Sequence, residues 1–174
     1  MKTILEGFRG YIHEAEFSEY SKGGNVILYH YMKKPRIGEE TEDTVLIDPK
    51  YFADPKTRSS YSRNEYEVST VPRTFWYVNP RQRERQVAQQ SILYIAKVSA
   101  DKIYDLRADP EEYKKAVAHP VYGLRKGVEW NTLLEKIRED YEGVFYGGSF
   151  DVVSLFTPHT ASRVPEEKQA SLEG

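Results

Sequence analysis

The most chemically capable residue of the chain is His30, which stands between Tyr29 and Tyr31 at the end of an apolar run that starts at Val26. An imidazole can carry a proton or hydrogen-bond a ligand near neutral pH. The tyrosines beside it offer flat rings with a polar edge, which suit the lining of a ligand site. A histidine inside an apolar strand is more commonly a hydrogen-bonded core residue, so both interpretations stay open.

Arg58, Arg63 and Arg73 form a second group with one shared chemistry. A guanidinium pairs bidentately with phosphate oxygens, so these side chains suit the binding of a diphosphate. Arg58 and Arg63 belong to a polar stretch that extends to Tyr66, is rich in serine, arginine and tyrosine, and has no clear period. Taken one at a time, each arginine is more simply explained as a surface residue.

The composition excludes several other kinds of site. There is no cysteine among the 174 residues, which excludes disulfides, cysteine-ligated zinc, iron–sulfur clusters and thiol catalysis. The 4 histidines are scattered, so no metal site is expected. The net charge of −2 gives no basic field for a nucleic acid, and no apolar run approaches the roughly 20 residues of a membrane span. The P-loop, the Rossmann glycine motif and the nucleophile elbow of hydrolases are also absent from the sequence.

We expect one domain of the α+β class, because strands and helices are interspersed too irregularly for a regular βαβ fold. Apolar and aromatic runs predict the strands, and apolar spacing with capping residues predicts the helices. The predicted strands are residues 26–31, 73–78, 92–98, 102–106, 144–146 and 151–156. The predicted helices are residues 81–90, 109–118 and 128–140, and the polar residues 161–174 are expected to be a frayed tail.

Residues 1–20 form a distinct segment of the sequence. Their apolar residues recur at helical spacing and predict a short amphipathic helix. Residues 21–25 contain two glycines and predict a linker, so that the main domain begins at residue 26. On this evidence alone, the segment is an N-terminal helix docked on the domain.

From residue 26 to about residue 160 the chain resembles an ADP-ribosyltransferase domain of the kind found in phage and toxin proteins. The likeness depends on several segments that follow one another in the family's order. In this sequence they are Leu28-Tyr29-His30, Leu46-Ile47-Asp48-Pro49, residues 58–63, Pro72-Arg73-Thr74-Phe75-Trp76-Tyr77, Tyr94 with Tyr104-Asp105-Leu106, residues 141–146 and residues 152–158. The resemblance implies a split β-sandwich with flanking helices that binds NAD, a co-substrate, in a cleft between two small sheets.

The same resemblance implies roles for individual residues. His30 would hydrogen-bond a ribose of NAD, and Tyr29 or Tyr31 would line the same cleft. Trp76 or Tyr77 would stack on the nicotinamide, a favourable contact for a cationic ring. The arginines named above would lie along the diphosphate. Tyr61 is a further candidate, because the stretch from residue 51 to residue 61 also resembles the nicotinamide-binding region of poly-ADP-ribose polymerases.

Enzymes of this family use a glutamate on a late strand to stabilise the positive charge that develops on the nicotinamide ribose. Counting back from Phe156, that position falls on Val152. The nearest acid is Asp151, one residue away, and a one-residue shift turns a side chain to the other face of a strand. A bulge after Gly147 could restore its direction, and Glu142 is the second candidate for the catalytic acid.

The N-terminal segment resembles the capsid-targeting propeptides of internal head proteins in T-even-type phages. In that family a maturation protease cuts after the glutamate of an Ile/Leu-x-Glu tripeptide, which here is Ile12-His13-Glu14. The cut would separate Glu14 from Ala15. The chain then divides into a propeptide (1–14), a linker (15–25), the domain (26–160) and a tail (161–174).

Together these resemblances predict a phage mono-ADP-ribosyltransferase that transfers ADP-ribose from NAD to host proteins. It would be packaged in the head, beside the scaffold and the maturation protease, and would act in the virion interior, in the host cytoplasm or in both. Membrane and nucleic-acid partners are not expected. Two alternatives remain: an inactive relative that serves as an internal head or host-binding protein, and an RNA-directed toxin-like enzyme in which His30, Arg63 and Arg73 serve phosphate chemistry.

Overall fold

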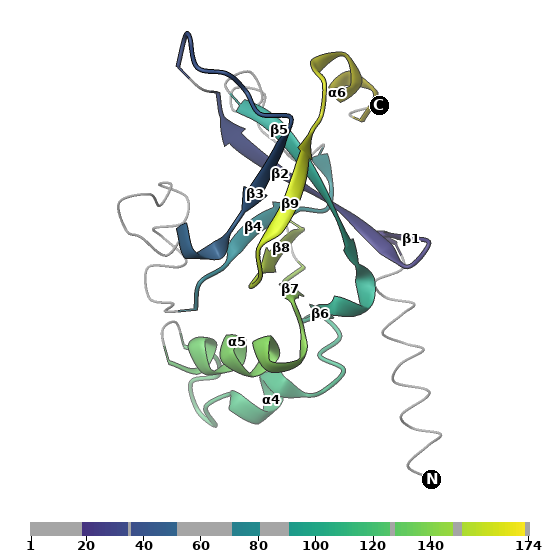
Figure 1. Ribbon diagram of the computed structural model, residues 1–174. Helices are drawn as coiled ribbons and strands as arrows, with labels where there is room; N and C mark the ends of the chain where they lie inside the picture. The colour runs from purple at the N-terminus through teal and green to yellow at the C-terminus, as the bar shows by residue number, and fades with distance from the viewer. Residues whose placement is uncertain are drawn as a thin grey trace.

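The structure, a computed structural model, describes residues 19–34, 36–51, 71–80, 91–125, 128–147 and 151–172 (Figure 1). A nine-stranded sheet dominates these residues, with short helices beside it, so the fold belongs to the α+β class that the sequence predicts. In this part of the chain no helix is both long enough and apolar enough to cross a membrane.

Six strands lie close to the predicted positions, and three were not predicted: β1, β3 and β9. They are β1 Ser21–Lys22, β2 Asn25–Lys33, β3 Thr44–Ile47, β4 Thr74–Tyr77, β5 Ser91–Ser99, β6 Ile103–Asp105, β7 Gly143–Phe145, β8 Val152–Leu155 and β9 His159–Arg163. Their order in the sheet is β3-β9-β5-β2-β4-β8-β7-β6, and β1 pairs with β2. Of the described pairs, only β6 with β7 is parallel. The order brings strands far apart in sequence, notably β2, β4 and β8, side by side.

The helices are short and lie outside the sheet. They are α4 Tyr113–Val117, α5 Glu129–Asp140 and α6 Glu166–Leu172, with 3-10 turns at Pro49–Tyr51 and Ala100–Lys102. α5 lies beside β6 and β7, with α4 next to it, at the opposite end of the molecule from α6 (Figure 1).

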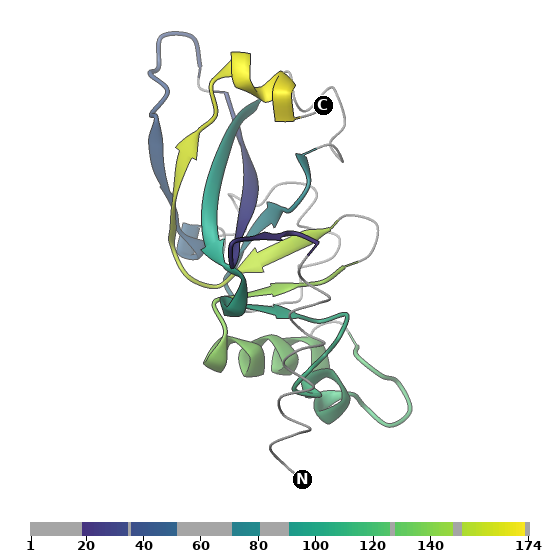
Figure 2. The same ribbon diagram turned by 90° about the vertical axis from the view of Figure 1, so that its right-hand side faces the viewer.

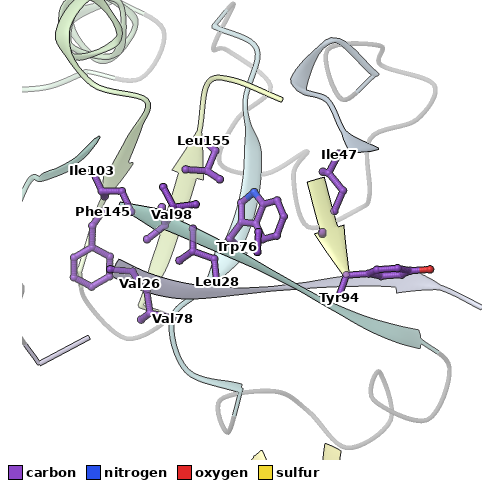
Figure 3. Packing of buried hydrophobic residues seen from close by; sticks show 13 residues of the cluster. Val26, Leu28, Ile47, Trp76, Val78, Tyr94, Val98, Ile103, Phe145 and Leu155 are labelled. Atoms are coloured by element: carbon purple, nitrogen blue, oxygen red, sulfur yellow. The ribbon is translucent and has the colours of Figure 1, made fainter. Parts of the chain in front are cut away.

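The sheet twists so strongly that β8, β7 and β6 run across the direction of β5 and β9 (Figure 2). One face of the sheet therefore bends over itself and encloses the main core (Figure 3). We call it the inner face. Its largest fully buried residues are Trp76, Phe145, Leu28, Ile103, Leu155, Val26 and Val153. Buried positions alternate along β2 and β4, as a strand with one buried face requires, whereas β8 is buried on both faces.

The opposite, outer face carries a second core where the helices cover it. Leu133, Leu134 and Ile137 of α5 are fully buried and pack with Tyr104 and Val144 of β6 and β7. The predicted apolar stripe of this helix is thus confirmed for these three positions. Val128, the fourth predicted member, precedes the helix and is 55% exposed.

The helix predicted from Asp109 begins later than expected, at Tyr113. Asp109 and Glu112 both adopt left-handed backbone conformations, with φ of 46° and 54°, so the chain turns before helical geometry can start. Asp109 nevertheless serves the helix end, because its carboxylate accepts hydrogen bonds from the amides of Lys114 (3.1 Å) and Lys115 (3.4 Å). The N-cap position is therefore Glu112 and not the predicted Asp109, although the Asp109 side chain bonds amides of the first turn.

The expectation of a frayed tail from residue 161 is corrected by β9. This strand lies between β3 and β5, with Val45 opposite Ala161 and Ile95 opposite Ser162. Ala161 is fully buried and Val164 is 6% exposed. The polar composition of β9 is misleading because Ala161 is its one buried residue, and the other four positions are polar and partly or fully exposed.

The part of the predicted linker that the structure describes is a hairpin. Ser21 pairs with Val26 and Lys22 with Asn25, around Gly23 and Gly24. Both glycines have positive φ, 61° and 78°, the combination that a two-residue hairpin turn of the right twist requires. The sheet therefore includes residues on both sides of the predicted limits at 26 and 160. The predicted helices at 1–20 and 81–90 fall wholly or almost wholly outside the described residues.

Candidate functional site

The segments with the strongest family resemblance meet on three adjacent strands, β2, β4 and β8. Tyr29 pairs with Tyr77, and Tyr77 pairs with Val152. One residue further along, the same register sets His30 opposite Trp76 and Trp76 opposite Val153. Successive side chains of a strand point to opposite faces. Tyr29, Tyr77 and Val152 therefore form a row on the outer face, and His30, Trp76 and Val153 form a row on the inner face.

His30 is 9% exposed and its ring lies 5.0 Å from that of Trp76, centroid to centroid. Its Nδ1 is 2.8 Å from the carbonyl oxygen of Phe75. A carbonyl only accepts, so Nδ1 carries the proton and donates, and Nε2 of the neutral ring is then an acceptor. This geometry fixes the tautomer and ties His30 to the neighbouring strand.

Trp76 is fully buried in the main core (Figure 3). Its Nε1–H donates to the hydroxyl of Thr74 at 2.8 Å, so the indole is packed and hydrogen-bonded at once. The ring exposes no face on which a nicotinamide could stack in this conformation. Of the two aromatic residues proposed for that role, Tyr77 is the half-exposed one.

Four aromatic residues line the outer face beside this row, and we call them the outer aromatic surface: Tyr29, Tyr31, Phe75 and Tyr77. All are half-buried. The rings of Tyr31 and Tyr77 meet edge to face at 6.0 Å, and burial raises the pKa of the Tyr29 hydroxyl. Partly exposed rings side by side can bind a flat heterocycle by stacking while their hydroxyls stay near water.

Arg73 places a cation at the end of this surface. Its guanidinium lies 5.4 Å from the centre of the Phe75 ring, and its Nη1 donates to the carbonyl oxygen of Val71 at 3.1 Å. The side chain is only 5% exposed. An arginine held against an aromatic ring with little rotational freedom loses little entropy when it pairs with an anion.

Asp151 lies at the start of β8 in a left-handed conformation, with φ 42°. Its carbonyl oxygen accepts a hydrogen bond from the amide of Val78 at 3.2 Å. Its carboxylate accepts one from the hydroxyl of Tyr20, and burial together with this carboxylate raises the pKa of Tyr20 to about 12. Asp151 therefore contacts the chain that enters the domain rather than His30.

Tyr20 belongs to a larger polar cluster with Arg107 at its centre. Arg107 donates from Nε and Nη2 to the two carboxylate oxygens of the fully buried Asp105, at 3.1 and 2.9 Å. Its Nη1 donates to Glu19 at 2.7 Å, and its guanidinium lies 4.5 Å from the centre of the Phe145 ring. Tyr20 packs edge-on against Phe145, with ring centroids 5.3 Å apart. The cluster fixes residues 19–20 on the domain.

Glu142, the other candidate acid, lies just before β7 beside His159. Its Oε2 is 3.8 Å from Nε2 of His159, which also lies 3.0 Å from the hydroxyl of Thr157. Burial lowers the pKa of His159, against the opposite effect of Glu142. The backbone amide of Phe156, just after the last residue of β8, donates to the Glu142 carbonyl. Asp151 precedes the first residue of the same strand. The two candidate acids thus lie at the two ends of one strand.

The predicted site residues therefore separate into groups. His30 and Trp76 share the inner face, and Tyr29, Tyr31, Tyr77 and Arg73 share the outer face. Arg58, Tyr61 and Arg63, and the processing residues Glu14 and Ala15, lie outside the described residues. Tyr20, Arg107 and His159 are not among the predicted site residues. For Arg107 a signal existed, since the run Asp105-Leu106-Arg107 puts an acid and an arginine on one side of a strand end.

Among the described residues, no group of three or more histidines, aspartates or glutamates is arranged to hold a metal ion. Comparison with known proteins adds no relative: no family model matches the chain, and no curated protein or solved structure matches it.

Proposed function

We propose that this chain is a mono-ADP-ribosyltransferase of the phage type, which transfers ADP-ribose from NAD to protein acceptors of a bacterial host. The supporting observation is the adjacency of β2, β4 and β8. Three segments chosen from sequence for their resemblance to this family, separated by many residues, are neighbours in the sheet. The finer fold expected from the resemblance, the split β-sandwich, belongs to the same proposal.

NAD would bind across these strands, with an aromatic ring of the co-substrate on the outer aromatic surface and its diphosphate near Arg73. His30 lies on the opposite, inner face, so in this conformation it would support the NAD site by tying β2 to β4 through the Phe75 carbonyl rather than by bonding a ribose. In the reaction, the bond between the nicotinamide nitrogen and the ribose C1′ breaks, and its electron pair leaves with neutral nicotinamide. The acceptor's nucleophile then bonds C1′ and loses a proton.

A carboxylate beside the ribose would stabilise the positive charge in the transition state. Asp151 and Glu142 can be compared directly. Asp151→Asn is a matched variant, because asparagine tolerates the left-handed backbone at this position, and Glu142→Gln keeps the length of its side chain.

The test uses the purified full chain with NAD labelled in its adenylate half and a bacterial lysate. We expect one or a few proteins to become labelled and nicotinamide to be released. Loss of label by about 100-fold or more in one of the two acid variants, with unchanged NAD affinity by calorimetry, would identify the catalytic acid. The absence of both labelling and NAD binding in the wild-type chain would refute the function.

One observation favours the inactive relative as a second candidate. Val152, at the position that corresponds to the family's glutamate, is apolar and 9% exposed. This alternative predicts a host partner that binds equally well with and without NAD, and no release of nicotinamide. Affinity capture with and without NAD, followed by identification of a direct binary complex, distinguishes it from the enzyme.

Packaging in the phage head is a separate part of the proposal. It predicts that the chain isolated from mature particles begins at Ala15. Mass spectrometry of purified virions measures this terminus directly. Recovery only from infected cells, with Met1 or Lys2 as the first residue, would leave a host-expressed effector.

A further inference from the structure

The connection between α4 and α5 contains a tight turn that exposes two apolar side chains. His119 and Gly123 exchange both of their backbone hydrogen bonds, at 2.8 and 2.9 Å, and Gly123 has φ 65°. Between them, Val121 and Tyr122 are 76% and 66% exposed. We call these two residues the tip. The connection projects beside the helices, away from the part of the sheet formed by β3 and β9 (Figure 2).

The tip is held in one conformation by its own contacts. Nδ1 of His119 accepts hydrogen bonds from the amides of Val121 (3.1 Å) and Tyr122 (3.2 Å). The His119 ring stacks on the Tyr122 ring at 4.9 Å, and the guanidinium of Arg125 lies 5.4 Å from the centre of the same ring. Arg125 is fixed in turn by Glu129, at 2.5 to 3.1 Å. An exposed aromatic that is ordered before binding loses little entropy when a partner covers it.

A chain of contacts joins the tip to the outer aromatic surface. Trp130 donates its amide to the carbonyl of Arg125 and stacks on Tyr146, with ring centroids 5.6 Å apart. The hydroxyl of Tyr146 lies 2.7 Å from that of Ser154, which is the β8 partner of Phe75. These contacts connect the tip, through Trp130 and Tyr146, to β8, one of the strands across which NAD is proposed to bind.

We propose that the tip docks the protein that accepts ADP-ribose, by inserting Val121 and Tyr122 into an apolar pocket of that protein. This inference rests on the proposed transferase function. Two projecting side chains cannot enclose a small ligand, so the partner must supply the concave surface. Aromatic anchors of this kind dominate the binding energy of protein interfaces.

The charges around the tip favour a protein partner over a nucleic acid. Arg125 is paired with Glu129, and Lys115 is paired with Glu112 at 3.6 Å. Nucleic-acid binding depends largely on the neutralisation of phosphates by basic side chains. Val121 is also a branched aliphatic residue without a flat face for a base. A largely neutral, apolar pocket on a folded protein complements this surface.

The experiment compares the full-length wild type with the double variant Val121→Ser/Tyr122→Ser by two readouts. Release of nicotinamide from NAD without acceptor measures the reaction centre, and labelling of protein in a bacterial lysate measures acceptor capture. We expect labelling to fall about tenfold or more, with nicotinamide release unchanged, because only docking is lost. Ile37→Ser is the control, since Ile37 is a fully exposed apolar residue distant in sequence from the tip, and it should leave both readouts unchanged.

A second pair of variants tests the conformation of the tip. His119→Ala removes the acceptor for two amides, whereas His119→Asn can supply a side-chain oxygen in its place. We expect labelling to fall in the first and to recover in the second. Unchanged labelling in the double variant, or label that is removed by nuclease rather than protease, would overturn the docking role. A wild type that neither binds NAD nor labels protein would overturn the transferase function and this inference with it.

Discussion

The inner and outer faces of β2, β4 and β8 give residues of the same kinds different environments. Trp76 and Tyr77 are consecutive aromatics, yet the first is fully buried and the second half-exposed. His30 and Tyr29 differ in the same way: the imidazole is bound to a backbone carbonyl, and the phenol lies among other rings on the outer face. The strand period of two decides which neighbour belongs to the core and which can meet a ligand.

Variants on the two faces are expected to lose activity for different reasons. A variant of an inner-face residue is expected to lower stability first, so a loss of the proposed NAD binding in such a variant would follow from a weakened fold. A variant in the half-exposed outer aromatic surface alters that surface with little effect on either core. Measurements that separate stability from binding are therefore needed for both faces.

The largest difference is expected between Trp76→Ala and Tyr77→Ala. Removing the buried indole leaves a cavity and should lower the free energy of unfolding by about 3–5 kcal/mol. The half-exposed Tyr77 should lose less than about 1.5 kcal/mol. Urea denaturation followed by circular dichroism measures both, and equal losses would contradict the assignment of the two faces.

A smaller loss is expected for His30→Ala. The variant removes the imidazole that donates to the Phe75 carbonyl at 2.8 Å, which costs about 1–3 kcal/mol. Tyr29→Ala, on the outer face, provides the matched comparison. Denaturation and NAD calorimetry on the same preparations separate the effects. Full stability in His30→Ala would mean that the hydrogen bond at 2.8 Å contributes nothing to the fold.

Tyr20→Phe tests the inner-face contact with Asp151 and should cost about 1 kcal/mol at neutral pH. The pKa of Tyr20 is raised to about 12 in the folded chain. Its neutral form is favoured by folding, so its contribution is complete below pH 10 and is lost as the pH rises through 12. Tyr104 and Tyr113 have raised pKa values as well. The informative quantity is therefore the difference between wild type and variant, which should shrink above pH 10.

The smallest effect is expected from His159→Gln in acid. Burial lowers the pKa of His159, so folding favours its neutral form. Its contribution is complete above the ordinary pKa of 6.5 and is lost as the pH falls below that value toward the folded pKa. The variant should show a shallower loss of stability over this range, by less than about 1 kcal/mol. Equal slopes in wild type and variant would show that His159 does not titrate differently on folding.

Much of the fold could be predicted from the sequence, because the strands around His30, Trp76 and Ile95 are dense in β-branched and aromatic residues. The strand β9 could not, since His159 to Arg163 reads as polar and its inward Ala161 is a small residue. The start of α4 was misplaced for a different reason. A run of Asp, Pro and Glu is a common first turn, and the left-handed backbone of Glu112 leaves no mark in the sequence.

The candidate site was predictable in part. The composition of Leu28 to Tyr31 and of Thr74 to Tyr77 drew attention to the right strands, and alternation alone could have separated their faces. The contacts of Asp151 with Tyr20 and of Arg107 with Glu19 join residues more than 80 positions apart. No local pattern encodes such pairs, because they depend on the path of the chain around the sheet.

The position of β9 affects how the chain folds as it is synthesised. In the described sheet, β3 pairs with β9 alone, and β9 joins it to the end of β5. Their hydrogen bonds to β9 cannot form before residue 163 has been made, more than 110 residues after β3 emerged. Contacts across such separations form slowly and leave strand edges unpaired in the meantime. The half of the sheet formed by β3, β9 and β5 is thus expected to be the last to close on a nascent chain.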